Sequence, residues 1–527
     1  MFAGRLSLAF LALLVGGAFA GLAVEAARDW SGAAAAFDGY MLRVAWFTFW
    51  QAALSALLSV IPAMFVARAL SRQREFPGRG LILRLFAVPL GLPAIVAALG
   101  ILALYGRAGI VADAVDAMGG GQWPSIYGLS GILVAHVFFN LPLATRLLLE
   151  ALETVPQDQW RLAAQLGMKP ASVFRLIEWP AMRRSLPGVA ALVFMLCVTS
   201  FTLVLTLGGG PAATTLEVAI YQSLRFDFEP ARAVALTLAQ IAMTIAAVLL
   251  MARLGASTTG DANLPVASRR FSDNSVTERL ANTVIIAIAA IFVAGPIIAV
   301  FVSGVEADIA RLVTERPVLR AASLSLSLAL CSALIAVAMS LSLAAMRSRL
   351  ARARRGKSSG FGEWMADQGP SLILVLPPIV IGAGWFVLVR GTVDVAALAP
   401  VMVITVNAAM AMPFAMRAIR PAWDNAALRN DRLCAQLGIS GFNRWQLIDW
   451  PAMRRPIAMA LAFAMALSLG DLGVIALFGS ESVQTLPYLL YLRLGAYRTA
   501  DAAGIALLLG LMCFVLMAIS DWLGRRS

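Results

Sequence analysis

Twelve long apolar runs divide this sequence, and they restrict the kinds of fold that it can adopt. A bilayer core about 30 Å thick is crossed by a helix of roughly 20 apolar residues, because an exposed backbone finds no water there. Hydrophobic residues make up 60% of the 527 residues and charged residues only 13%, which excludes an ordinary soluble domain. We therefore expect an all-α polytopic membrane protein with about twelve transmembrane helices. The expected spans cover residues 6–24, 42–68, 83–105, 126–147, 186–207, 233–252, 283–303, 320–346, 371–390, 396–416, 456–478 and 502–522.

The net charge of +13 is explained by the position of the basic residues rather than by a nucleic-acid partner. Arginines gather between the second and third spans and between the eighth and ninth, whereas the loops on either side are nearly neutral. Because cytoplasmic loops carry the excess of Lys and Arg, both termini are predicted to be cytoplasmic in a multi-pass membrane protein. The expected partners include the lipid bilayer and no nucleic acid. The basic loops contain Arg68, Arg72, Arg74, Arg79, Arg84, Arg347, Arg349, Arg352, Arg354, Arg355 and Lys357.

The second half of the sequence repeats the first. LIEWPAMRR at Leu176–Arg184 recurs as LIDWPAMRR at Leu447–Arg455, and Thr215-Leu216 matches Thr485-Leu486. The repeated unit holds about six spans, and it repeats in parallel because an even number of spans returns the chain to its starting side. We predict a first permease-like repeat at 1–255, a cytoplasmic linker at 256–280 and a second repeat at 281–527.

The first span has two interpretations. Arg5, the apolar run after it and the small-residue string Ala18-Phe19-Ala20 also fit a cleavable signal peptide. However, the seventh span precedes the second repeat as the first span precedes the first repeat. The repeat therefore favours a retained first helix.

The longest repeated segment is RLAAQLGMKPASVFRLIEWPAMRR at Arg161–Arg184, aligned with RLCAQLGISGFNRWQLIDWPAMRR at Arg432–Arg455. Gly167 and Gly438 suit the left-handed residue that ends a helix, so each copy is predicted to form two short helices at an angle. In the second short helix, Phe174 and Ile177, like Trp445 and Ile448, share a face. Pro180 and Pro451 are expected to end that helix and return the chain to the membrane.

Such a segment could lie on the lipid surface as an amphipathic helix held by arginines. Two copies with the same WPAMRR ending favour a repeated protein partner instead.

The repeated segment resembles the EAA loop of permease subunits of binding-protein-dependent ABC importers. The family pattern is Glu-Ala-Ala, three residues, Gly, nine residues, then Ile-x-Leu-Pro, and the loops here cover 158–184 and 429–455. The resemblance implies two type I importer permease repeats, each docking one subunit of a cytoplasmic ABC ATPase dimer. The chain departs from the pattern at Arg161 and Arg432, where the family often has Glu, and at Trp179 and Trp450 in place of Leu. The implied coupling residues are Arg161, Ala163, Gly167, Phe174, Ile177, Pro180, Arg432, Gly438, Trp445, Ile448 and Pro451.

Further strings are similar to fused permeases of bacterial thiamine importers, including FWQAALSALLSVIPAMFVARAL, LTLGGGPAATTLEVAIYQSLRFDFEPARA and SLGDLGVIALFG. This resemblance implies a protein of the bacterial inner membrane that imports thiamine and thiamine phosphates from a periplasmic thiamine-binding protein. Fused permeases for ferric iron share the architecture, so another small solute remains an alternative. An ion-coupled secondary transporter is a further alternative, but such proteins need intramembrane ionisable relays that most spans lack. A scaffold or receptor that does not transport stays open.

The chain is not expected to be an enzyme or to bind a cofactor. Gly356-Lys357-Ser358 imitates part of a phosphate loop, but Ala351 stands where the first glycine is required. ATP and Mg²⁺ are therefore expected in a partner ATPase. The single histidine, His136, lies in a span without a second ligand nearby, so no metal site is expected.

Asp471 is the candidate residue of the substrate path. It lies in an apolar run, where a carboxylate costs about 2.5–3.5 kcal/mol, and Gly470 and Gly473 leave room beside it. Its charge could offset the loss of hydration of thiamine's positive thiazolium ring. Alternatively, Asp471 lies near the outer end of its span or pairs with an arginine such as Arg493.

Overall fold

The structure is a computed structural model that describes residues 1–253, 276–353 and 360–525. Most of the predicted linker, residues 256–275, lies outside the described residues, as does the Gly356-Lys357-Ser358 string. The last five residues assigned to the linker, 276–280, open a long helix.

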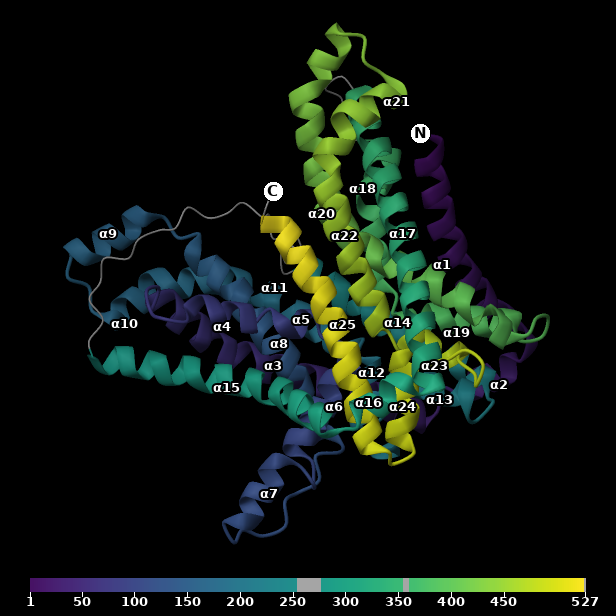
Figure 1. Cartoon of the computed structure of the whole chain (residues 1–527), viewed down its shortest axis with the longest axis horizontal. Coiled ribbons are helices and arrows are strands. Elements are labelled where there is room, and N and C mark those ends of the chain that lie inside the picture. The colour runs from purple at the N-terminus through teal and green to yellow at the C-terminus, as the bar shows by residue number, and fades with distance from the viewer. Residues whose placement is uncertain (254–275, 354–359, 526–527) are drawn as a thin grey trace.

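The described part of the first half is helical throughout (Figure 1). A long first helix and a long third helix precede a group of shorter ones, and three more long helices follow with short elements between them. Its elements are α1 (Phe2–Arg28), α2 (Trp30–Ala35), α3 (Gly39–Arg72), α4 (Arg79–Leu85), α5 (Val88–Gly91), α6 (Ala94–Tyr105), α7 (Ile110–Ala117), α8 (Leu129–Glu153), α9 (Gln157–Gln165), α10 (Pro170–Val173), η1 (Phe174–Glu178), α11 (Trp179–Val198), α12 (Phe201–Leu207), η2 (Pro211–Ala213), α13 (Leu216–Arg225) and α14 (Pro230–Arg253).

The second half follows nearly the same order of elements, although it has no separate helix corresponding to α7 or α9 among its described residues. This order supports the parallel repeat, which remains a prediction. The elements are α15 (Val276–Glu306), α16 (Ile309–Thr314), α17 (Arg316–Ala353), α18 (Phe361–Leu372), η3 (Ile373–Val375), α19 (Pro378–Val389), α20 (Val395–Gln436), α21 (Gly441–Arg444), η4 (Trp445–Asp449), α22 (Trp450–Gly470), α23 (Gly473–Phe478), α24 (Leu486–Gly495) and α25 (Thr499–Arg525).

The predicted all-α polytopic class with about twelve spans is confirmed. Eleven helices of the described chain are long and apolar enough to cross a membrane. A twelfth span results if Phe361–Val375 and Pro378–Val389, bent by 84°, count as one.

Two predicted spans, 186–207 and 456–478, are each broken in two. The first breaks between α11 and α12, where Gln51 Nε2 donates to the Cys197 carbonyl at 3.1 Å and Gln240 Nε2 donates to the Val198 carbonyl at 3.4 Å. These amides satisfy carbonyls that a continuous helix would have paired. The second break falls at Asp471, between α22 and α23.

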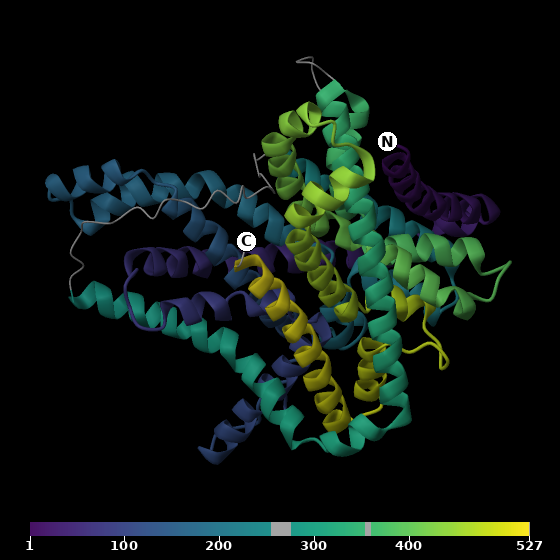
Figure 2. The ribbon, with the colours of Figure 1, turned by 45° about the horizontal axis from the view of Figure 1, so that its top comes forward.

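The first helix of each half packs on the other half (Figure 2). Helix α1 lies against α19 and α17, and α15 lies against α6 and α3. At the α1–α19 crossing, Trp385 Nε1 donates to the Leu14 carbonyl at 2.8 Å, and Arg390 Nη2 lies 2.7 Å from Glu25 Oε1. The halves are therefore interlocked by exchanged helices.

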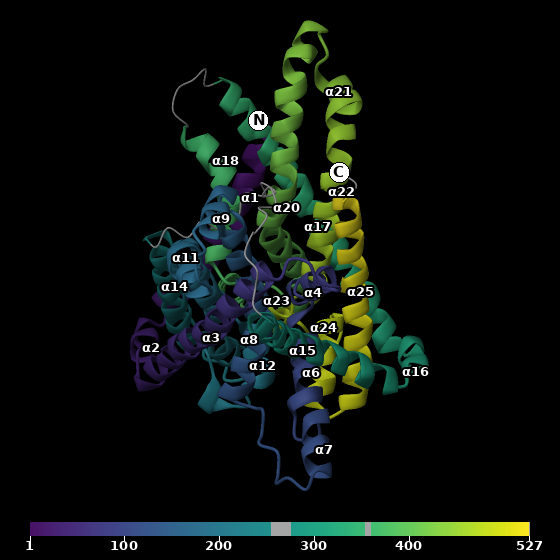
Figure 3. The same cartoon turned by 90° about the vertical axis from the view of Figure 1, so that its left-hand side faces the viewer.

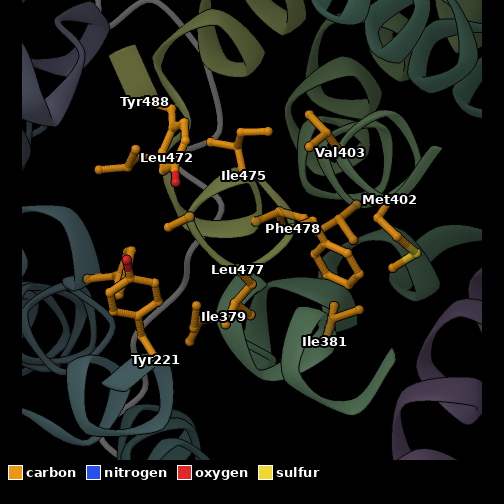
Figure 4. Packing of buried hydrophobic residues seen from close by; sticks show 14 of the residues in the cluster. Tyr221, Ile379, Ile381, Met402, Val403, Leu472, Ile475, Leu477, Phe478 and Tyr488 are labelled. Atoms are coloured by element: carbon orange, nitrogen blue, oxygen red, sulfur yellow. The ribbon is translucent and has the colours of Figure 1, made fainter. Parts of the chain in front are cut away.

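Short helices of both halves meet at the centre of the molecule. Tyr221 of α13 lies beside Ile379 of α19 and Leu477 of α23 in one apolar cluster (Figure 4). Arg225 Nη2 donates to the Gly479 carbonyl at 2.9 Å and so joins the two halves by a hydrogen bond.

Glycines allow the close crossing of α1 and α19. A Cβ on Gly21 would lie 2.0 Å from the Gly384 carbonyl oxygen, whereas a Cβ on Gly16 would meet nothing within 4 Å. We expect Gly21→Val to lower the free energy of unfolding by about 1–3 kcal/mol, because the helices would be forced apart. Gly16→Val, on the exposed side of the same helix, is the matched control. Unfolding midpoints of the purified proteins in detergent check this prediction, and equal loss in both variants would contradict it.

Candidate functional site

The first repeated loop forms two short helices with a small core of its own. Helix α9 ends before Gly167, whose φ of 58° is left-handed as predicted. Trp160, Ala163 and Val173 are buried together, and Ile177 packs against them. Ala163 and Ile177 therefore hold the angle between the two helices, since their side chains face the loop rather than a partner.

The second repeated loop differs at its start. Helix α20 runs without a break from Val395 to Gln436, so the expected first short helix is the end of a 42-residue helix. In the first half Pro156 separates α8 from α9, and the aligned position of the second half is Ala427. An alanine lets the helix continue where a proline lacks the N–H that the helix needs. Gly438 follows this helix at a φ of 65°, again as predicted.

The expectation that Pro180 and Pro451 end their helices is wrong. Each proline lies in the first turn of a long membrane helix, α11 or α22, and the helix before it runs on through a π-helical turn, η1 or η4. In η1, the Trp179 N–H donates to the Phe174 carbonyl, five residues back. This wider turn makes room for the proline ring, so the loop helix and the membrane helix form one continuous rod.

The predicted face of the second short helix lies mostly against the chain itself. Phe174 is half-buried under the Arg68 guanidinium, whose Cζ lies 4.7 Å from the ring centroid. Trp445 lies between Trp423 and Trp450, with ring centroids 6.4 and 6.1 Å away. Ile448 is also half-buried, while Arg161, Arg432, Gly438 and Pro451 are exposed.

Three leucines in each loop are exposed at matching positions. Leu162, Leu166 and Leu176 are 55%, 67% and 63% exposed. Their counterparts Leu433, Leu437 and Leu447 are 50%, 63% and 64% exposed. We call these the leucine surfaces of the two loops. None of these leucines was predicted as a site residue, although both copies share the strings RLxAQLG and LIxWPAMRR. The exposure of the leucines depends on how the loop helices pack.

Asp471 lines a cavity of about 240 Å³ between the two halves. Residues 90–94 and Thr202 of the first half line the cavity, together with Phe463, Gly470, Asp471 and Met517 of the second half. The Gly473 N–H donates to Asp471 Oδ1 at 3.2 Å. Oδ2 is buried and has no hydrogen-bond partner within the described chain. This oxygen is available to a bound group.

The alternative pairing of Asp471 with Arg493 is wrong. Arg493 Nη1 lies 2.9 Å from Asp501 Oδ2, and its Nη2 contacts Glu315. These three residues form an ion-pair cluster that also includes Arg311 and Arg498.

His136 is buried and lies 2.9 Å through Nδ1 from Ser55 Oγ. Within residues 1–253, 276–353 and 360–525, no group of three or more His, Cys, Asp or Glu side chains is placed to hold a metal ion. The expected absence of a metal site stays a prediction.

Comparison with known proteins matches residues 60–260 to the family model described as "Binding-protein-dependent transport system inner membrane component". The thiamine transport system permease protein of Brucella abortus (strain 2308) is 59% identical over 519 residues, covering 98% of this chain and 94% of that protein. The chain belongs to this permease family. The Escherichia coli (strain K12) member is 44% identical over 490 residues, covering 93% of this chain and 90% of that protein. The Haemophilus influenzae (strain ATCC 51907 / DSM 11121 / KW20 / Rd) member is 36% identical over 521 residues, covering 98% and 94%.

Family membership makes the chain a transport subunit, and its candidate spans make it a multi-pass protein of the inner membrane. The matched family segment includes the first repeated loop, whereas the second loop lies beyond it.

The left-handed glycines provide a test of the loops. A Cβ at Gly167 or Gly438 would meet nothing within 4 Å, so a valine there is disfavoured by the backbone conformation rather than by crowding. A left-handed L-residue costs about 1–2 kcal/mol. We expect the Gly167→Val, Gly438→Val double variant to insert normally but to bind an ATPase partner several-fold more weakly.

Co-purification of the ATPase with each variant measures this binding. Gly391→Val is the control, because Gly391 also has open space around it but lacks a left-handed φ. Unchanged recovery of the ATPase with the double variant would contradict the predicted role of the two loops in ATPase binding.

Proposed function

We propose that this chain is the membrane-spanning permease of a thiamine ABC importer. It moves thiamine and thiamine phosphates from a periplasmic binding protein into the cytoplasm, powered by a separate ATPase. The observation that supports this most is the 59% identity, over 98% of the chain, to a thiamine transport system permease protein. The cavity between the halves, with an unused carboxylate oxygen, is suited to an organic cation.

In this proposal, each leucine surface docks on one subunit of a cytoplasmic ATPase dimer. Exposed leucines on short helices are suited to a protein contact, because burial of their apolar area is favourable. The continuous rods formed with α11 and α22 carry the movement of the loops into the membrane. ATP and Mg²⁺ bind the partner ATPase, and this chain binds no cofactor.

The proposed orientation places both termini and both repeated loops in the cytoplasm. Helices α7 and α21 lie at opposite ends of the molecule (Figure 3), and α9 lies at the left edge in Figure 1. The basic end of α3 contacts the first loop through Arg72, and the basic end of α17 contacts Asp431 of the second loop through Arg352. Each loop therefore lies beside arginines, of which an excess is expected in the cytoplasm. The α7 side would then face the periplasm and the binding protein.

Reconstitution in proteoliposomes tests this function. The chain, its candidate ATPase and its candidate binding protein are combined, and uptake of labelled thiamine is measured beside ferric iron. We expect thiamine uptake that requires all three components and ATP. Uptake of iron instead would contradict the substrate, and uptake driven by an ion gradient without the ATPase would contradict the importer class.

The same assay tests Asp471. A charge-assisted contact contributes about 1.5–3 kcal/mol, so Asp471→Asn is expected to lower thiamine uptake about tenfold or more. Glu75→Gln, at an exposed position between α3 and α4, is the control and should transport normally. Unchanged uptake by assembled Asp471→Asn complex would exclude a required charge contact.

A further inference from the structure

Glu178 is a buried carboxylate at the point where the first loop joins the membrane helix α11. Its side chain is 0% exposed and lies between two arginines of α3. Arg68 Nε lies 2.8 Å from Oε2, and Arg72 Nε lies 3.0 Å from Oε1. Both carboxylate oxygens are therefore held by guanidinium groups. A buried ion pair of this kind is held in a defined geometry, because either charge alone would be left uncompensated.

Arg72 also contacts the rest of the loop and α15. Arg72 Nη2 donates to the Pro170 carbonyl at 3.3 Å, and Arg72 Nη1 lies 3.4 Å from Glu278 Oε1. The next residue, Gln73, donates through Nε2 to the Arg279 carbonyl at 2.6 Å. Glu278 and Arg279 belong to α15, the first helix of the second half. The cluster thus joins the loop, α3 and α15.

Helix α15 continues this connection toward the cavity. It packs against α6 and α25. Ala94 opens α6 and Met517 lies on α25, and both line the cavity that contains Asp471. A displacement of the first loop that moved α15 would therefore also shift α6 and α25, which carry two of the residues that line the cavity.

The second loop is linked differently. Asp449, which aligns with Glu178, lies 3.3 Å from Arg444 of its own loop. Arg444 contacts Asp431 of α20 at 2.5 Å, and Arg352 of α17 contacts the other oxygen of Asp431 at 3.0 Å. The α17 position that aligns with Arg68 is Ala345. The second loop is connected to its membrane helices through an intermediate aspartate that belongs to its own half.

We propose that Glu178 is a positioning residue that makes the first loop, the end of α3 and the start of α15 move as one body during the ATPase cycle. This inference rests on the proposed docking of the loop on an ATPase. The first loop is then joined by ion pairs to a helix of the opposite half, whereas the ion pairs of the second loop reach only elements of its own half. The two loops transmit different movements although their sequences are repeated.

Distances between spin labels test the rigid body directly. Labels are placed at Gln165 of α9 and Leu280 of α15, both exposed, in a chain whose four cysteines are replaced. We expect the distance in the complex with its ATPase to be the same without nucleotide and with trapped ATP. In Glu178→Gln, which keeps the shape but removes the charge, we expect it to change with nucleotide. A nucleotide-dependent distance in the unsubstituted chain would overturn the proposal, as would a constant distance in Glu178→Gln.

The amount of solute transported per ATP hydrolysed provides the second measurement. Glu178→Gln should lower this ratio severalfold in complex that still assembles and hydrolyses ATP, and Asp449→Asn, the matched control, should leave the label distance unchanged. A proportional loss of assembly, hydrolysis and uptake in Glu178→Gln would show a merely structural role and overturn the proposal. Absence of thiamine uptake by the unsubstituted complex would refute the proposed substrate, but the label distances would still decide this inference, because they require only the ATPase and nucleotide.

Discussion

The bilayer requires every backbone polar group to find a partner within the protein, and the architecture depends on how this chain meets that requirement. Continuous helices do so over most of the membrane. Where a helix is interrupted, a side chain must replace the lost bond. In the first half Gln51 and Gln240 serve the free carbonyls at the end of α11. At the corresponding break in the second half, Asp471 accepts the Gly473 N–H with one oxygen. Its other oxygen is left for a ligand, so the break that shapes the fold also creates the candidate site.

The two halves share an order of elements but differ at the positions that bear on transport. Helix α7 projects from the first half, whereas five residues, 390–394, connect α19 to α20 at the corresponding position of the second. Pro156 separates α9 of the first loop from the preceding membrane helix α8, whereas α20 continues without a break into the second loop. Because one chain contains both halves, they do not have to be identical copies, and each can differ at these positions.

Sequence patterns predicted much of this molecule because they report local physics. The apolar runs located the spans, and Gly167 and Gly438 marked the left-handed ends of helices. Features that depend on long-range contacts were not accessible in this way. The helix continues past Pro180 because a π-helical turn accommodates the proline ring. Arg493 of α24 forms ion pairs with Glu315, which follows α16, and with Asp501 of α25, so it does not pair with Asp471. Exposure of the leucine surfaces likewise follows from how the loop helices fold over their own core.

In the proposed function, one chain supplies both halves of the transport pathway and both docking sites for the ATPase. Native mass spectrometry of the complex purified in detergent tests it most directly, because the mass gives the number of each subunit. We expect one copy of this chain with two ATPase subunits. A complex of two copies of this chain with two ATPase subunits, or of one copy with a single ATPase subunit, would contradict it.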